Sequence, residues 1–465
     1  MAVERTAPPI EPPVTSRVAT AVVALCLVQF IDVLGVTVVV TALPHMLSDV
    51  RAGPSAGSLV ATGYAMFFGG LLMFGARLGD RVGHRRCILA SLVVFGVGAA
   101  LGAIASSIWV LTAARCVQGA AAATAVPSAL RLLTTVADSE VMRRRALAAW
   151  SAAGAAAGAS GFVIGGVVVQ LTSWRFIFWG YVPLAIGLAV TVMRTVPSGG
   201  PGDADRRLNF ASSALLTAAV MAAVVGATEA AAPDRGLLGG VLIVAAVVLC
   251  IALRAVDRRA EAPLLPQALL RRSPLRRGAI GSSLNTATTT SVATLVTLYL
   301  QDALFRSPLS AAAILFPLSI AAVLGAALAA PALRTVRPER VAAAGLSVIA
   351  LGVGVLIPTA THVVAITACM AAVGFGLGLS SVATTSLGTD VPEDDRAAAS
   401  GLINTTAQLG TAIGIAVLVL TAAATDRTPA AGTAPPSIAW GLAALVAALG
   451  AVAFTLLRPS VGRSI

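Results

Sequence analysis

Charged side chains are scarce in this sequence, and lysine is absent from it altogether. Charged residues make up 11% of the 465 residues, hydrophobic residues make up 57%, and the mean hydropathy is +0.91. All 32 basic residues are therefore arginine, and against 20 acidic residues they give a net charge of +12. This composition lies outside the range of soluble globular domains. Because the arginines are scattered over many short segments, we expect no nucleic-acid partner.

Cysteine and histidine are also sparse, with five cysteines and three histidines. The cysteines lie in or at the ends of apolar stretches without the spacing of metal ligands, which is typical of packing residues rather than of a disulfide framework. His84 and His362 have no neighbouring ligand in the sequence. We therefore expect no metal site, no cofactor and no catalytic residues, so the protein is not predicted to be an enzyme.

What the sequence does contain is a series of long apolar runs. The hydrocarbon core of a bilayer needs about 20 apolar residues per helix. We count fourteen such spans, at about 18–41, 58–78, 87–107, 109–134, 146–170, 176–195, 210–230, 236–256, 278–301, 309–333, 340–358, 363–388, 397–424 and 436–457. These spans predict an all-α polytopic membrane protein with about 14 transmembrane helices.

The arginines alternate between the connections of these spans. We place 25 of them on the tails and on the connections that share their side, and two, Arg115 and Arg131, inside a span. The other side holds only five: Arg51, Arg175, Arg235, Arg306 and Arg427. Positive charge resists translocation, so the arginine-rich side is expected to be cytoplasmic. Both termini are then cytoplasmic, and the predicted location is a plasma membrane, the bacterial inner membrane.

Two polar stretches divide the spans into six, two and six. The predicted organisation is a cytoplasmic tail (1–17), a six-helix bundle (18–195), linkers with two inserted helices (196–277), a second six-helix bundle (278–457) and a short cytoplasmic tail (458–465). A basic connection follows the second span and recurs at the corresponding place in the later half. This repeat indicates two bundles related by pseudo-symmetry, which is how rocking transporters are built.

Ionisable residues within spans mark the candidate site. Asp32 lies about 21 Å from the inner boundary and Arg115 about 9 Å below the outer one, so both reach one depth in a core of about 30 Å. Tyr64 reaches the same level, and Gln118 lies one turn from Arg115. We interpret the four as a buried cluster in which Asp32 and Arg115 couple transport to protons. The alternative is a structural pair that fixes helix register.

Polar residues in the later half are candidates for a substrate cavity. Asn285, Thr286, Thr290 and Thr294 lie in one span, and Asn404 and Gln408 form an i,i+4 amide pair in another. The alternative is that the hydroxyls bond to carbonyls of their own helix.

The connection after the second span carries a specific motif, from Arg77 to Arg86. It resembles the signature loop of the major facilitator superfamily, and the whole chain resembles the fourteen-helix drug:proton antiporters of that superfamily. The segment from Thr37 to Pro44 is similar to their first-helix motif. Leu111, Arg115, Gln118 and Gly119 match the fourth-helix motif, and the fifth span carries the glycines of an antiporter motif: Gly158, Gly161, Gly165 and Gly166. One departure is Gly35, where the family usually has an acid; here the acid is Asp32, one turn away.

The resemblance implies a gating role for the loop residues Gly79, Asp80, Arg81, Gly83, Arg85 and Arg86. Asp80 is expected to accept hydrogen bonds at a helix N-terminus or to pair with Arg81 or Arg85, forming a latch that closes in one conformation.

We therefore predict a proton-coupled exporter of small, mostly apolar organic compounds such as drugs, antibiotics or secondary metabolites, working by alternating access. Its partners are the substrate, protons and membrane lipids, its energy source is the proton gradient, and we expect a monomer. An uptake symporter of the same fold is the alternative, because the residues do not fix direction. A sensor or enzyme would need an output domain, and a channel would need a repeated pore signature; the sequence suggests neither.

Overall fold

The computed structural model describes residues 16–53, 57–137, 139–197, 209–230, 235–261, 263–264, 269, 271–391, 396–425 and 435–456. Residues 1–15 of the first predicted tail, all of the second (458–465) and residues 198–208 of the first predicted linker lie outside this part.

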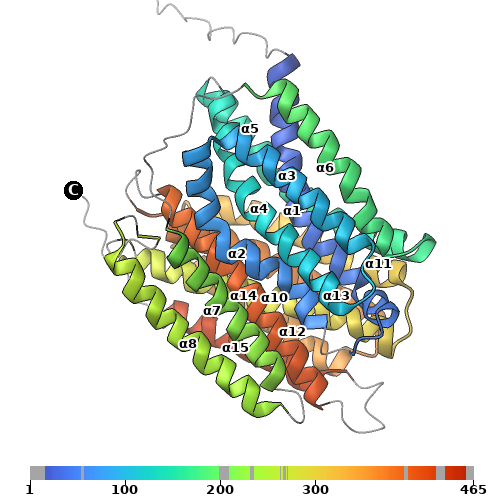
Figure 1. Cartoon of the computed structure of the whole chain (residues 1–465). Coiled ribbons are helices and arrows are strands. Elements are labelled where there is room, and N and C mark those ends of the chain that lie inside the picture. Colours follow the sequence, from blue (N-terminus) through green and yellow to red (C-terminus); the bar gives the residue numbers. More distant parts are fainter. Residues whose placement is uncertain are drawn as a thin grey trace, which may run out of the picture.

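Within the described residues the chain forms fourteen α-helices of 20 residues or more and one short π-helix, η2 (Tyr299–Ala303). The helices are α1 (Ser16–Asp49), α2 (Gly57–Val82), α3 (His84–Ala103), α4 (Ile108–Val136), α5 (Glu140–Leu171), α6 (Arg175–Thr195), α7 (Phe210–Ala230), α8 (Gly236–Arg259), α10 (Ser273–Leu298), α11 (Pro308–Ala332), α12 (Pro338–Thr359), α13 (Val363–Gly388), α14 (Arg396–Thr425) and α15 (Ser437–Leu456) (Figure 1).

Twelve of these helices are long and apolar enough to cross a membrane. The all-helical, multi-pass class predicted from the sequence is therefore confirmed. The two exceptions are α7, whose apolar stretch covers Phe210–Ala223, and α10, which is rich in threonine and serine. That α7 and α10 cross the membrane, which would make fourteen crossings, stays a prediction.

Helices α1–α6 and α10–α15 form two bundles with the same pattern of neighbours. In the first bundle, α1 packs on α5, α2 on α4, and α3 on both α4 and α6. In the second, α10 packs on α14, α11 on α13, and α12 on both α13 and α15. Each helix of one bundle thus has a counterpart nine positions later in the numbering. The two most extensive contacts between the bundles, α2 with α14 and α5 with α11, obey the same correspondence. These pairings are the pseudo-symmetry that the basic connections indicated.

The inserted helices cover the contact between α2 and α14, which we call a seam between the bundles. Helix α7 packs on both α2 and α14, and α8 packs on α7, so the pair occupies the flank opposite α6 (Figure 1). The approach of α7 to α2 is close at Gly70, where a Cβ atom would stand 2.5 Å from Oγ1 of Thr217. Only 17% of the apolar window of α8 is buried, which leaves most of that helix to face lipid.

One carboxylate connects the start of α7 to the end of α8. Asp257, in the last turn of α8, accepts hydrogen bonds from the Asn209 side chain (3.1 Å) and from the backbone of Leu264 (2.6 Å). Asn209 in turn accepts from the backbone N–H of Ser212 in the first turn of α7 (3.0 Å). The residue before Leu264 in this linker, Pro263, accepts a hydrogen bond from Arg77 of α2 through its carbonyl. The connection between the inserted pair and the second bundle is therefore attached to the first bundle.

Candidate functional site

Asp32 and Tyr64 form the centre of a polar cluster inside the first bundle. The Tyr64 hydroxyl, on α2, donates a hydrogen bond to Oδ1 of Asp32, on α1. Asp32 is 7% exposed and Tyr64 is fully buried. A carboxyl group at this depth is costly without partners, and here a phenol from a neighbouring helix supplies one.

Arg115, on α4, completes the cluster from the other side of Tyr64. Its Nη2 donates to the carbonyl oxygen of Gly35 (2.9 Å) and its Nη1 to Oε1 of Gln118 (3.2 Å). The guanidinium carbon lies 4.6 Å from the centre of the Tyr64 ring, in a cation–π contact. One side chain of α4 is thereby connected to both α1 and α2.

The four residues expected to share one depth do meet, and the alternative, a structural pair of Asp32 and Arg115, is not formed as an ion pair. None of the ion pairs formed by the described residues joins Asp32 to Arg115. Tyr64 lies between them instead, with its hydroxyl on the acid and its ring under the guanidinium. Sequence spacing gives the height of a side chain along a helix, whereas the packing of the helices decides which neighbour it faces. The role of Asp32 and Arg115 in proton coupling stays a prediction.

Tyr181, on α6, lies next to this cluster and was not predicted from the sequence. It is 2% exposed, and its hydroxyl has no hydrogen-bond partner among the described residues. A Cβ atom built on Gly35 would stand 3.8 Å from this hydroxyl and 4.0 Å from Nη1 of Arg115. Tyr181 lies six residues into α6, and Arg115 lies seven into α4 from the same side of the bundle. Counting depth on α6 as well could have found it.

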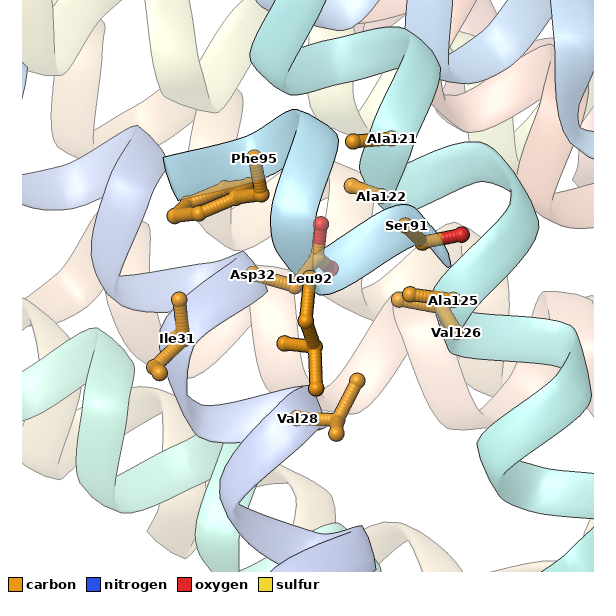
Figure 2. A pocket seen from close by; sticks show the side chains of 10 residues that line it. All are labelled: Val28, Ile31, Asp32, Ser91, Leu92, Phe95, Ala121, Ala122, Ala125 and Val126. Atoms are coloured by element: carbon orange, nitrogen blue, oxygen red, sulfur yellow. The ribbon is translucent and has the colours of Figure 1, made fainter. Parts of the chain in front are cut away.

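A small cavity adjoins Asp32 between α1, α3 and α4. Its volume is about 20 Å³, room for about one water molecule. Its lining is Val28, Ile31, Asp32, Ser91, Leu92, Phe95, Ala121, Ala122, Ala125 and Val126. Figure 2 shows the Asp32 carboxylate among these side chains, with the Ser91 hydroxyl pointing away from it (Figure 2). That hydroxyl bonds to Thr124 of α4 (2.5 Å) and to the carbonyl of Cys87 (2.7 Å). Asp32 is the only ionisable residue among those that line the cavity.

The hydroxyls of α10 mostly follow the alternative interpretation. Thr294 bonds back to the carbonyl of Thr290 (2.9 Å) and is fully buried, as expected for hydroxyls satisfied by their own helix. Thr286 also bonds back but donates across to the carbonyl of Ala407 in α14 (2.6 Å). Asn285 is 1% exposed and donates to the carbonyl of Leu377 in α13 (3.3 Å). Their predicted contact with a substrate is not tested by these bonds.

The predicted amide pair of α14 lies beside the seam with α2. Asn404 is exposed, and Gln408 is partly buried. The Cβ of Gln408 stands 2.8 Å from where a Cβ on Gly69 of α2 would be, so the absence of a side chain at position 69 lets the two bundles approach. Gln408 is therefore placed between the bundles, where an alternating-access site is expected.

One ion pair of the loop motif differs from the pairs expected, and the gating role of the loop stays a prediction. Asp80 pairs with His84, one turn later (3.2 Å), rather than with Arg81 or Arg85. Arg85 donates instead to the carbonyl of Met193 in α6 (2.6 Å). The i,i+4 spacing of Asp80 and His84 explains the preference, because such residues face one another on consecutive turns.

The glycines of the motif allow close contacts at the turn between α2 and α3. Gly83 has a φ of 98°, in the region that favours glycine. A Cβ on Gly79 would stand 2.4 Å from the His84 ring and 2.6 Å from the hydroxyl of Ser128. The remaining two arginines, Arg81 and Arg86, are exposed.

The α5 glycines divide between two neighbouring helices. Cβ atoms on Gly161 and Gly165 would stand 1.8 Å and 2.1 Å from the hydroxyls of Thr37 and Thr41 on α1. Gly166 instead faces α11 of the other bundle, where a Cβ would be 2.8 Å from the carbonyl of Pro308. A Cβ on Gly158 would have more room, because the nearest atom would be 3.9 Å away. The Gly158 carbonyl accepts a hydrogen bond from the Ser319 hydroxyl of α11 (2.9 Å).

A further hydrogen bond joins the bundles near η2. Gln301 of η2 donates to the carbonyl of Thr41 in α1 (2.9 Å). This bond, the bond from Ser319 to Gly158 and the close approach at Gly166 all connect the two bundles. They extend from the middle of the bundles to the end where α5 connects to α6.

Two six-helix bundles related by pseudo-symmetry, with an ionisable cluster buried in one of them, define a secondary transporter. The family model of the Major Facilitator Superfamily matches residues 25–415, and the chain belongs to that superfamily.

Its relatives include the cephamycin export protein CmcT of Amycolatopsis lactamdurans, 33% identical over 90% of this chain and 87% of that protein. The puromycin resistance protein pur8 of Streptomyces alboniger is 28% identical over 85% and 80%. Among solved structures, a bacterial homologue of the human lysosomal transporter Spinster, in an inward-facing and occupied conformation, matches with a TM-score of 0.69 at 14% identity. That match covers 96% of this chain and 97% of the other. It supports the fold.

Proposed function

We propose that the protein is a proton-coupled exporter of small, mostly apolar organic compounds, working by alternating access in the plasma membrane. The export direction is supported by relatives that span nearly the whole chain and whose names describe antibiotic export or resistance. The observation that carries the coupling is the Asp32–Tyr64–Arg115 cluster. It places one protonatable carboxyl among groups from three helices of one bundle.

In this proposal Asp32 binds a proton from the outside and releases it to the inside while the bundles rock. One elementary charge crossing 100 mV is worth about 2.3 kcal/mol, so a total force of about 180 mV supplies about 4 kcal/mol, or roughly a thousandfold gradient. A neutral or zwitterionic substrate exchanged for one proton uses the whole force. No acid other than Asp32 is buried in the membrane-spanning part of the two described bundles away from the helix ends. One proton per cycle and neutral or weakly charged substrates are therefore favoured.

The rest of the proposal follows the charge distribution and composition. Both termini are cytoplasmic, the proton gradient is the energy source without a cofactor, and the protein acts as a monomer. The partners are the exported compound, protons and the surrounding lipids.

The test is substrate-dependent proton movement in everted vesicles and proteoliposomes. Addition of substrate to everted vesicles should alkalinise the lumen as substrate accumulates there, and Asp32→Asn should abolish both effects. Asp390→Asn, which neutralises an exposed acid beyond the end of α13, is the matched control and should behave as native protein. Native-level pumping by Asp32→Asn would refute the site, and lumen acidification would indicate an uptake symporter.

A further inference from the structure

A larger groove lies next to the Asp32 cavity, on the membrane-facing side of α2, α3 and α4. Its volume is about 270 Å³. The lining is Leu78 and Val82 of α2, Arg86, Cys87, Ala90, Ser91 and Val94 of α3, and Ala120, Ala121 and Thr124 of α4. Ser91 and Ala121 also line the Asp32 cavity, so they form a wall shared by the two spaces.

Small side chains on two helices produce this groove. Ala90 on α3 and Ala120 and Ala121 on α4 leave a hollow between the backbones, while larger side chains of α2 and α3 flank it. Val82 is 41% exposed and Val94 44% exposed, so the groove opens on the outer surface of the bundle. That surface faces hydrocarbon in a membrane-spanning bundle. An almost wholly apolar lining favours an acyl chain over water there.

Arg86 distinguishes this groove from other apolar hollows. It is exposed at the end of the groove, in the first turn of α3, and none of the ion pairs formed by the described residues includes it. Arg86, Ala90 and Val94 succeed one another at four-residue spacing on one face. The groove therefore runs from the guanidinium for about 12 Å into the membrane, at 1.5 Å per residue. A basic group at the mouth and an apolar channel behind it complement an anionic lipid.

We propose that this groove binds an anionic glycerophospholipid of the cytoplasmic leaflet, with one acyl chain against Ala90 and Ala120 and its phosphate on Arg86. The bound chain covers the lipid side of the Ser91–Ala121 wall and keeps water from the Asp32 cavity on that side. This binding site is independent of transport direction and of proton coupling.

The test uses the full-length protein in lipid nanodiscs that contain a phosphatidylglycerol or a phosphatidylcholine with a photoreactive diazirine in one acyl chain. After irradiation, labelled peptides are mapped by mass spectrometry. Label should concentrate on the α3 and α4 residues of the groove. The phosphatidylglycerol probe should label these residues more strongly than the phosphatidylcholine probe does. Ala90→Phe should fill the groove and remove this label, whereas Val93→Phe, on the same helix but outside the groove, should not. Ala120→Leu provides a second filling variant should Ala90→Phe not fold.

The headgroup contact is tested by two arginines of the same loop region. Arg86→Gln should reduce the preference for phosphatidylglycerol about fivefold, which corresponds to about 1 kcal/mol for one basic residue at the membrane surface. Arg81→Gln removes the same charge without touching the groove and should change the preference little. Equal loss in both variants, label spread evenly over Val93 and the groove, or label unaffected by either filling variant would overturn the proposal.

Discussion

The polar cluster around Asp32 in the first bundle bonds mainly between helices, whereas most hydroxyls of α10 bond within their own helix. Tyr64 donates to Asp32 across α2 and α1, and Arg115 reaches from α4 to the backbone of α1. Thr294 and Thr297 donate to carbonyls one turn earlier in α10. Both regions place polar atoms at membrane depth. In the cluster most of the bonds make the position of one helix depend on the side chains of another, whereas in α10 this holds for Asn285 and Thr286. Substitutions should therefore act on geometry and coupling in the first bundle and mainly on local helix stability in α10.

Among the substitutions that test this comparison, the largest effect is expected at Arg115. Arg115→Lys keeps the charge but cannot donate to Gly35 and Gln118 at once while stacking on Tyr64, because an ammonium lacks the planar fork of a guanidinium. We expect proton-driven transport to fall by at least about tenfold, since two charge-assisted bonds are weakened. Arg131→Lys, at an exposed position of the same helix, should leave transport unchanged. Full activity of Arg115→Lys in proteoliposomes would mean that only the charge matters.

The α5 glycines should separate packing within a bundle from contact between bundles. Gly161→Ala places a methyl group against Thr37 inside the first bundle, so we expect a loss of about 1 to 3 kcal/mol of stability, measured as a lower Tm in detergent. Gly166→Ala meets Pro308 and Ala312 of the other bundle, so transport should decline with a smaller change in Tm.

The control for these glycines is Gly187→Ala in α6. No atom lies within 4 Å of a Cβ there, and the change should be neutral or slightly stabilising. Equal Tm losses for Gly161→Ala and Gly166→Ala would show that the seam between bundles is as rigid as the bundle interior.

Much of the fold was readable from the sequence because a bilayer imposes simple rules. Span length predicted the helices, and two polar stretches indicated their grouping into six, two and six. The loop motif and the α5 glycines indicated the superfamily. Hydropathy did not identify α10 clearly as a membrane span, because its many hydroxyl groups lower the mean hydropathy of the helix. These hydroxyls can nevertheless be buried, because they bond to carbonyls of their own helix.

The partners inside the site were harder to predict. Depth along each helix could be counted, so Asp32, Tyr64, Arg115 and Gln118 were grouped correctly. Which of them touch depends on the rotation of each helix about its axis, and that is set by packing against helices far away in the sequence. Tyr64, rather than Arg115, is therefore the residue that hydrogen-bonds to Asp32. The Asp80–His84 pair is a different case, since its i,i+4 spacing was visible in the sequence.

The two buried tyrosines of the cluster offer a matched pair of smaller perturbations. Tyr64→Phe removes the hydrogen bond to Asp32 and keeps the ring beneath Arg115, so it should cost about 1 kcal/mol and reduce coupled transport. Tyr181→Phe removes a buried hydroxyl that has no partner among the described residues, so stability should stay equal or rise. Thermal unfolding and transport of the two variants check this. A larger loss in Tyr181→Phe would show that its hydroxyl acts in another conformation.

The smallest effects should come from the threonines of α10, where the contrast between helices can be tested within one helix. Thr286→Val loses the bond to Ala407 of α14 and should cost about 0.6 kcal/mol, the average for a hydrogen bond between membrane helices. Thr294→Val loses only a bond to its own helix, and because valine fills the same volume, the change in Tm should be close to zero. Unfolding in detergent measures both. If Thr294→Val proved the more damaging, a bond within one helix would matter as much as one between helices. If either variant changed substrate selectivity with Tm unaltered, that hydroxyl would belong to the substrate cavity after all.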